Sequence, residues 1–507
     1  MRKIPSIMAT QHPDNASAPF WDKKGNGFVS IYEELPEAMT CFRELGVDEF
    51  MWDYEGKYAD EAVMDKLFSH YHGYFEKTLL GKEKFLTFRL PNVWQERGYS
   101  LIRALMVILT SEDFAGDLGF HSPPLFEVIL PMTENAKQLL YIQKSFRELA
   151  RFKYRTFSHK RVSNSELIEM IPLVESVESQ MEIGHLLYEY AKLHKKNFKK
   201  NPVYIRPFLA RSDPSLVSGL LATVLANKIA LSEISNFSKK TGIKTYPILG
   251  AGSLIFRGGL SPDRMKVFVK EYGGISTITM QSAFRYDYPL NKVKKCVEFL
   301  SRTLRKTKAQ RMTEAETKEL KKMVGRFARA YQSALFPVTQ DLEGIFAAVP
   351  RRRERRLHIG LLGYNRKSGK LNLPRAINFT AAFYSIGIPP EFIGLGRVLK
   401  DMSPAEIKLL KKFYVNFSYD LKQAGRYLNR ENLLILSKDG RKESVGWQKI
   451  LEDVLEMERV LGTVFSPKTL SELEHRNLSS NTLLLRKNPE LVSKLITETG
   501  VLRKSLG

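Results

Sequence analysis

Charged side chains recur at or near the ends of apolar runs in this chain. Asp213 follows the run VYIRPFL in LARSDPS, and Arg89 lies at the end of KFLTFRL. Glu127 lies inside PLFEVIL, and His12 lies in TQHPDN near the start of the chain. Carboxylate oxygens are the ligands that a hard divalent cation such as Mg²⁺ or Mn²⁺ prefers, and the planar arginine fork matches carboxylate and phosphate. Together these residue types suit chemistry on a small, doubly anionic phosphorylated acid.

Three further segments carry candidate residues. GAGSLIFRGGLSP contains Arg257, QSAFRYDYP contains Gln281 and Arg285, and PRRRERR places five arginines around one glutamate. Each feature also has a purely structural explanation. Asp213 in SDP can be a helix N-cap, Glu127 a buried paired carboxylate, the glycine-rich segment a tight turn, and the arginine segment a solvated face. No Ser-His-Asp or HExxH motif is present, so nucleophilic and zinc-protease chemistry have no support in the sequence.

The elements that must position these residues are short apolar runs that alternate with helical patterns. We expect strands at residues 47–53, 84–90, 124–130, 168–174, 203–209, 243–249, 275–280 and 357–363. Strands that alternate with helices predict an α/β fold with a parallel sheet, and eight of them predict a TIM-type (β/α)8 barrel with additional helices, largely C-terminal. We expect one unit over residues 1–507, with the barrel at about 40–365 and a helical part at about 366–507. In such a barrel the chemistry lies at the carboxyl ends of the strands.

Composition narrows the classes of partner. The chain has 507 residues, 43% of them hydrophobic, and a net charge of +24, which fits acidic small substrates, nucleic acid or an anionic membrane surface. Cys41 and Cys296 are the only cysteines, which excludes a disulfide framework and a CxxC zinc pattern. We find no signal peptide, no membrane span and no RRM, KH, helix-turn-helix or zinc pattern. We therefore expect a cytoplasmic protein without a nucleic-acid or membrane partner; a nucleic-acid-binding protein stays as the alternative that charge alone supports.

The motifs together resemble archaeal-type phosphoenolpyruvate carboxylase, the short form of that enzyme, over essentially the whole chain. IPSIMATQHPDNA is similar to the N-terminal signature of the family, and to TAHPTE of the long bacterial and plant form. PLFEV resembles PLFET, ARSDPSLVSG resembles YSDSNKDAG, and GAGSLIFRGG resembles GRGGSIGRGG. TFRLPN, QSAFRYDYP and LPRAINFTAAFYSIG are similar to DIRQ, QGEMIRFKYGLP and SLRAIPWIFAW. The arginine segment falls where the long form has SRPAKRRP.

The resemblance implies a role for each matched residue. Glu127 and Asp213 would be the ligands of Mg²⁺ or Mn²⁺. The residues implied in catalysis are His12, Arg257, Arg375 and Arg89. The residues implied in substrate binding are Arg285, Gln281, Arg353, Gly258 and Gly259.

The implied reaction converts phosphoenolpyruvate and bicarbonate into oxaloacetate and inorganic phosphate, with a homotetramer as the expected assembly. His12 would act as general base, the metal as a Lewis acid, and residues 350–356 with the C-terminal GVLRKSLG as a closing segment. The long form has a His-x-Arg ahead of its glycine-rich loop, where this chain has Leu249 and Ala251, and the residues that replace them stay open, as does the register of residues 351–356. Another metal-dependent barrel enzyme acting on phosphoenolpyruvate or a related keto acid is the second alternative.

Overall fold

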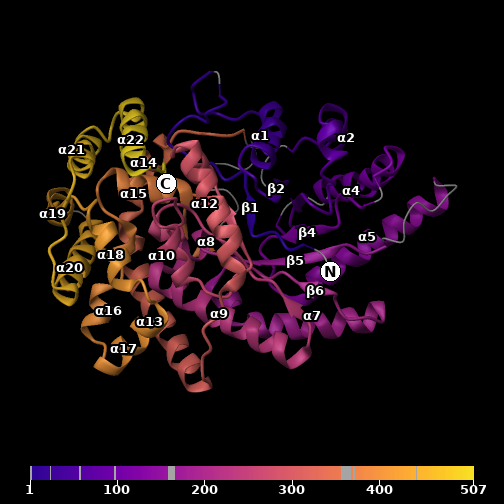
Figure 1. Cartoon of the computed structure of the whole chain (residues 1–507). Coiled ribbons are helices and arrows are strands. Elements are labelled where there is room, and N and C mark those ends of the chain that lie inside the picture. The colour runs from indigo at the N-terminus through magenta and orange to yellow at the C-terminus, as the bar shows by residue number, and fades with distance from the viewer. Residues whose placement is uncertain are drawn as a thin grey trace.

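The computed structural model describes residues 3–22, 24–55, 59–95, 99–120, 122–157, 166–354, 367–368, 371–440 and 442–507. Within these residues the chain forms a parallel barrel with helices around it and a helical part at one side (Figure 1). The expected strand at residues 357–363 lies outside the described residues.

The barrel closes through eight parallel strands in the described part of the chain, in the order β1-β10-β9-β7-β5-β4-β3-β2. This confirms the predicted TIM-type architecture. The strands are β1 (Ile7–Ala9), β2 (Glu49–Asp53), β3 (Phe85–Arg89), β4 (Glu127–Leu130), β5 (Glu169–Val174), β7 (Phe208–Ala210), β9 (Ile248–Gly250) and β10 (Thr277–Met280).

The barrel begins earlier than the sequence suggested. Strand β1 pairs with β10 through Ile7 and Ile278, and with β2 through Met8 and Glu49, so it closes the barrel. The expected start near residue 40 was therefore wrong. Three residues show no alternation of apolar and polar side chains, which is why this strand gave no signal.

Two predicted strands are interrupted by proline. The run at 203–209 splits into β6 (Tyr204–Ile205) and β7, with Pro207 between them, and the run at 243–249 splits into β8 (Lys244–Thr245) and β9 around Pro247. Strands β6 and β8 pair with each other outside the barrel. Proline lacks the amide hydrogen that a continuous ladder needs, so each run changes sheet at that point.

Helices surround the barrel and cover the outer faces of the strands. They are α1 (Ile31–Arg43), α2 (Val63–His70), α3 (His72–Phe75), α4 (Tyr99–Asp117), α5 (Ala136–Thr156), α6 (Val177–Met181), α7 (Ile183–Phe198), α8 (Ser212–Ser218), α9 (Leu220–Thr241), α10 (Met265–Glu271), α11 (Ser282–Tyr286) and α12 (Leu290–Thr303), with the 3₁₀ turns η1 (Ile255–Arg257) and η2 (Leu304–Lys306). Local signals start them: the Asn135 side chain accepts from the amides of Lys137 and Gln138 at the first turn of α5.

The C-terminal part is helical beyond residue 374, as predicted, and gathers at one side of the barrel (Figure 1). After α13 (Glu314–Val338), η3 (Gln340–Leu342), α14 (Glu343–Ala348) and the hairpin β11 (Lys367–Ser368) and β12 (Leu371–Asn372) come α15 (Ala376–Ser385), η4 (Pro390–Phe392), α16 (Gly396–Lys400), α17 (Pro404–Phe413), α18 (Phe417–Gly425), α19 (Arg430–Lys438), α20 (Ser444–Leu461), α21 (Leu470–Leu484) and α22 (Pro489–Arg503). These helices share a hydrophobic cluster with α9 and η1, so the helical part is packed onto the barrel. Among the described residues no helix has the length and apolar character needed to cross a membrane.

Candidate active site

A cavity of about 110 Å³ opens at the carboxyl end of the barrel strands. This is the end at which TIM-type barrels place their chemistry, because the βα loops meet there. A cavity of this volume suits a small acid. The polar side chains in its wall come from nearly every strand end: Gln11, His12, Asp53, Glu55, Arg89, Glu175, Arg211, Ser212, Asp213, Arg257, Thr279, Gln281, Arg353, Glu354 and Arg375.

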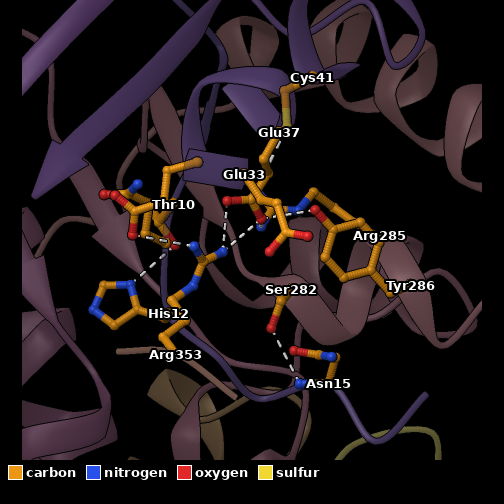
Figure 2. Close-up of polar contacts among 12 residues, drawn as sticks. Thr10, His12, Asn15, Glu33, Glu37, Cys41, Ser282, Arg285, Tyr286 and Arg353 are labelled. Atoms are coloured by element: carbon orange, nitrogen blue, oxygen red, sulfur yellow. Dashed lines mark hydrogen bonds and ion pairs between the residues drawn. The ribbon is translucent and has the colours of Figure 1, made fainter. Parts of the chain in front are cut away.

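His12 follows β1 and faces this cavity, as predicted. Its Nδ1 lies 2.9 Å from Thr10 Oγ1, which fixes the ring (Figure 2). Burial, and after it the neighbouring charge of Arg89, lower the pKa of His12 to about 3. The imidazole is therefore neutral near pH 7.

Arg89 ends β3 and also lines the cavity, but carboxylates already engage its guanidinium. Its Nε and Nη2 donate to the two oxygens of Asp53 at 2.8 and 2.6 Å. Its Nη1 lies 2.8 Å from Glu55 Oε2. Arg89 thus brings two acidic side chains to the cavity wall with it, and its charge is compensated before any ligand arrives.

Arg257 occupies the centre of a hydrogen-bond network at the cavity. It ends η1, and its Nη2 donates to Gln281 Oε1 at 2.5 Å, its Nη1 to Asp14 Oδ2 at 3.2 Å and its Nε to Ser212 Oγ at 3.2 Å. The Gly507 carbonyl oxygen also accepts from Nη1, so the C-terminal segment reaches the site as expected. Burial lowers the pKa of Arg257 and the Asp14 carboxylate opposes that effect. Arg257 and Gln281, which come from two separate motifs, therefore meet here.

Gly258 and Gly259 shape the turn beneath Arg257 and are not in the cavity wall, which contradicts the prediction that they bind substrate. Their φ angles are 130° and 75°, a region that side chains other than glycine rarely adopt. A Cβ on Gly258 would also lie 2.7 Å from the Cβ of Ala251. These glycines let the chain reverse so that Arg257 points inward.

Glu127 lies at the opposite end of the barrel, which contradicts its prediction as a metal ligand. It is the first residue of β4, and its Oε1 accepts from the Tyr204 hydroxyl at 2.6 Å. Its Oε2 accepts from Arg206 Nη1 at 2.7 Å, and the same arginine binds Glu49 at the start of β2. This buried ion cluster belongs to the barrel interior at the amino ends of the strands, so the structural explanation of Glu127 was the correct one.

Glu175 takes the place that Glu127 was expected to have. It directly follows β5 in PLVES and lines the cavity together with Asp213, which lies in the first turn of α8. The amide of Met132 donates to Glu175 Oε2 at 2.7 Å. The chain contains PLxE twice, and only in the second copy does the glutamate come after the strand. Strand-end position was the signal that could have found Glu175.

Two carboxylates at one cavity wall fit a divalent cation of the Mg²⁺ or Mn²⁺ type. Such ions take oxygen ligands and keep open positions for water and substrate oxygens, so Glu175 and Asp213 suffice as protein ligands. No group of three or more His, Cys, Asp or Glu side chains suited to a metal occurs in the part of the chain that the structure describes. Glu175 and Asp213 alone do not make a closed structural zinc site, which takes four ligands that are mostly Cys and His.

The side chains of the arginine segment bind carboxylate and carbonyl groups of the protein itself. Arg353 lines the cavity, yet its Nη2 donates to both oxygens of Glu37 at 2.5 and 2.6 Å. Arg352 donates to the backbone carbonyls of Asn15 and Ala16. Arg285 is fully buried, binds the same Glu37 at 2.9 Å and is not in the cavity wall, which contradicts its prediction as a substrate ligand (Figure 2). Arg352 thus fastens the N-terminal segment that carries His12, and Arg353 and Arg285 fasten α1.

Comparison with known proteins now decides the family. The family model described as phosphoenolpyruvate carboxylase matches residues 4–507. The chain belongs to the phosphoenolpyruvate carboxylase family. It is 43% identical to the phosphoenolpyruvate carboxylase of Leuconostoc mesenteroides, over 100% of this chain and 99% of that one. It is 35% identical to that of Metallosphaera sedula over 100% of both chains, and 36% identical to that of Pyrococcus abyssi over 90% and 95%. The resemblance to the archaeal-type enzyme is thereby confirmed.

One solved structure is a distant match. The malate synthase of Haloferax volcanii has a TM-score of 0.40 and 12% identity, covering 83% of this chain and 98% of that one. A likeness of that degree has no bearing on the activity.

Two positions where this chain departs from the long form of the phosphoenolpyruvate carboxylase family are filled by buried apolar side chains. Leu249 lies in β9 and Ala251 directly after it, and both are almost fully buried. Arg211 is a cavity-wall residue that sequence analysis did not assign, and it lies in the same LARSDPS motif as Asp213. Arg375, the residue before α15, is in the cavity wall as predicted.

Proposed function

We propose that this member of the phosphoenolpyruvate carboxylase family forms oxaloacetate and inorganic phosphate from phosphoenolpyruvate and bicarbonate. The observation that carries the proposal is the cavity at the carboxyl ends of the strands, where the acid pair Glu175 and Asp213 shares a wall with Arg257 and His12. This set supplies cation ligands, an anion clamp and a proton acceptor for a phosphorylated acid. The full-length match to the family supports the choice over another barrel enzyme.

The substrate anion would be held by arginine. Arg257 and Arg375 offer planar forks to the phosphate and carboxylate groups, and preorganised cations of this kind stabilise the charge that moves during phosphoryl transfer. Glu175 and Asp213 would hold Mg²⁺ or Mn²⁺, which when bound supplies charge stabilisation for the enolate oxygen. Attack of a bicarbonate oxygen on phosphorus, with cleavage of the enol oxygen–phosphorus bond, gives carboxyphosphate and the enolate of pyruvate.

His12 would act in the second step. With Nδ1 engaged by Thr10, Nε2 takes the proton of the carboxyphosphate carboxyl group; the carbon–oxygen bond to phosphate breaks, and carbon dioxide and phosphate form. A bound anion next to Arg89 and Arg257 would oppose their effect and raise the pKa of His12 from about 3. The enolate carbon then attacks carbon dioxide. Met51, Leu173 and Phe208 in the cavity wall would limit water, which would otherwise protonate the enolate to pyruvate.

The deciding experiment is bicarbonate-dependent formation of oxaloacetate from phosphoenolpyruvate, followed with malate dehydrogenase and NADH. Activity that needs phosphoenolpyruvate, bicarbonate and Mg²⁺ or Mn²⁺ together supports the proposal. If the protein consumed phosphoenolpyruvate equally well without bicarbonate, the proposal would be wrong and the cavity would catalyse a different reaction. We further propose a cytoplasmic homotetramer with small-molecule substrates and no nucleic-acid partner, which sedimentation and binding measurements would test.

A further inference from the structure

The turn that carries Arg257 is anchored in the C-terminal helical part of the chain. Phe256, the residue before Arg257, is fully buried, and its ring stacks on Phe379 of α15 with the centroids 5.6 Å apart and the planes 27° apart. Phe256 belongs to the hydrophobic cluster of the C-terminal helices, whereas Arg257 faces the barrel cavity. Any shift of Phe256 would therefore move the guanidinium.

A buried acid holds the backbone of this turn. Glu391 of η4 is fully buried, and its Oε1 accepts from the Phe256 amide at 2.8 Å and from the Tyr384 hydroxyl at 2.7 Å. Among the described residues, Glu391 Oε2 is buried and has no hydrogen-bond partner. Both donors thus converge on one oxygen, and no hydrogen bond stabilises a charge on the second oxygen.

The surroundings of Glu391 favour the uncharged acid. Burial raises the pKa of Glu391 to about 7, and the hydrogen bonds from Tyr384 and Phe256 and the charge of Arg264 oppose that effect only in part. Arg503 of α22 lies over the Tyr384 ring, with its guanidinium carbon 5.7 Å from the ring centroid. The groups around Glu391 that carry or can carry a charge thus include Tyr384, which donates to it, Arg264, whose charge lowers its pKa, and Arg503 beside Tyr384.

We propose that Glu391 is a positioning residue for the reaction, which sets Arg257 for the substrate anion by holding the Phe256 amide. The inference rests on the proposed function, because the anion in question is phosphoenolpyruvate. An ionised Glu391 would add a negative charge behind the turn that carries Arg257 and would weaken the field that attracts the substrate. A neutral acceptor of the same shape keeps the turn in place without that effect.

Two variants separate position from charge. Glu391→Asp draws the acceptor back by one methylene group, away from the Phe256 amide, and should lower kcat/KM for phosphoenolpyruvate by about 10²-fold, as small misplacements of catalytic groups do. Glu391→Gln keeps the accepting oxygen and the length, and should stay within about threefold of the wild type at pH 7. Asp453→Asn is the matched control: Asp453 is a buried acid of α20 that accepts from the amides of Gly394 and Arg397 and from the Arg397 guanidinium, and neither partner belongs to η1. Its loss should lower the thermal unfolding midpoint and leave kcat/KM unchanged.

A double-variant cycle and a pH profile complete the test. In an Arg257→Lys background, Glu391→Asp should lower kcat/KM for phosphoenolpyruvate little further, because the guanidinium that Glu391 positions is already absent. Between pH 6 and 9 the wild-type kcat/KM should fall relative to that of Glu391→Gln, since only the wild type gains a charge at residue 391. A full additional 10²-fold loss in the Lys background, a wild-type rate for Glu391→Asp, or parallel pH profiles would each overturn the inference. A wild-type protein that forms no oxaloacetate at all would instead refute the proposed function.

Discussion

We expect substitution of the two PLxE glutamates, Glu127 and Glu175, to have opposite effects on activity and on stability. We expect Glu175→Gln to abolish most turnover and to leave the fold intact, because an amide oxygen can still accept from the Met132 amide. We expect Glu127→Gln to keep its turnover and to lose stability. The pair is a direct test of which glutamate belongs to the active site.

The magnitudes follow from the contacts of each carboxylate. Glu127 accepts from the Tyr204 hydroxyl with one oxygen and from Arg206 with the other. Glutamine offers a single oxygen, so one buried donor loses its acceptor, at a cost of about 1–3 kcal/mol in the free energy of unfolding. Loss of a charged cation ligand at residue 175 removes several kcal/mol of transition-state stabilisation, and about 4 kcal/mol corresponds to roughly 10³-fold in kcat.

The assays are coupled oxaloacetate formation, urea unfolding followed by circular dichroism, and Mn²⁺ binding followed by electron paramagnetic resonance. Glu175→Gln should bind Mn²⁺ more weakly than the wild type, and Glu127→Gln should bind it equally well. If Glu127→Gln lost turnover and Mn²⁺ binding while Glu175→Gln kept both, the barrel-end argument would be refuted and the assignment from the sequence motif restored.

Three other predictions follow from the same site. His12→Asn should lower oxaloacetate formation by about 10²–10⁴-fold and release pyruvate in a bicarbonate-dependent way; lactate and malate dehydrogenase report the two products, and oxaloacetate at the wild-type rate would remove His12 from the mechanism. Arg257→Lys should lower kcat/KM for phosphoenolpyruvate by about 10²-fold, because an ammonium group cannot reach Asp14, Gln281 and the substrate as a planar fork does; retention of most of kcat/KM would show that it is no clamp. The pKa of Glu391 is raised from 4.5 to about 7, so the folded state keeps a proton that the unfolded state loses, and the free energy of unfolding should fall by about 3 kcal/mol as pH rises through this window. Glu391→Gln lacks that slope, and equal pH dependence of unfolding in both proteins would contradict the assignment.

The class of fold and most of the chemistry could be predicted from the residues alone. Alternation of apolar runs and helical patterns was enough for a parallel barrel, and the motifs around His12, Asp213 and Arg257 were enough for the family. These signals are local, because each lies within a dozen residues. Each can therefore be recognised in the sequence without knowledge of what the segment packs against. The cavity wall contains all three residues.

The partner of each charged side chain could be identified only in the folded chain. Arg353 and Glu37 are 316 residues apart in the chain, and Nη2 of the arginine donates to both oxygens of the carboxylate. No local pattern could show that this arginine already has a partner. Glu127 and Glu175 have almost the same local motif, and only the bounds of β4 and β5 place one at the amino end of the barrel and the other at the carboxyl end. A buried charge without a partner is costly, so each buried charged side chain pairs with a group that lies close to it in space. Which groups lie close to one another is set by the folding of the whole chain and cannot be read from neighbouring residues in the sequence.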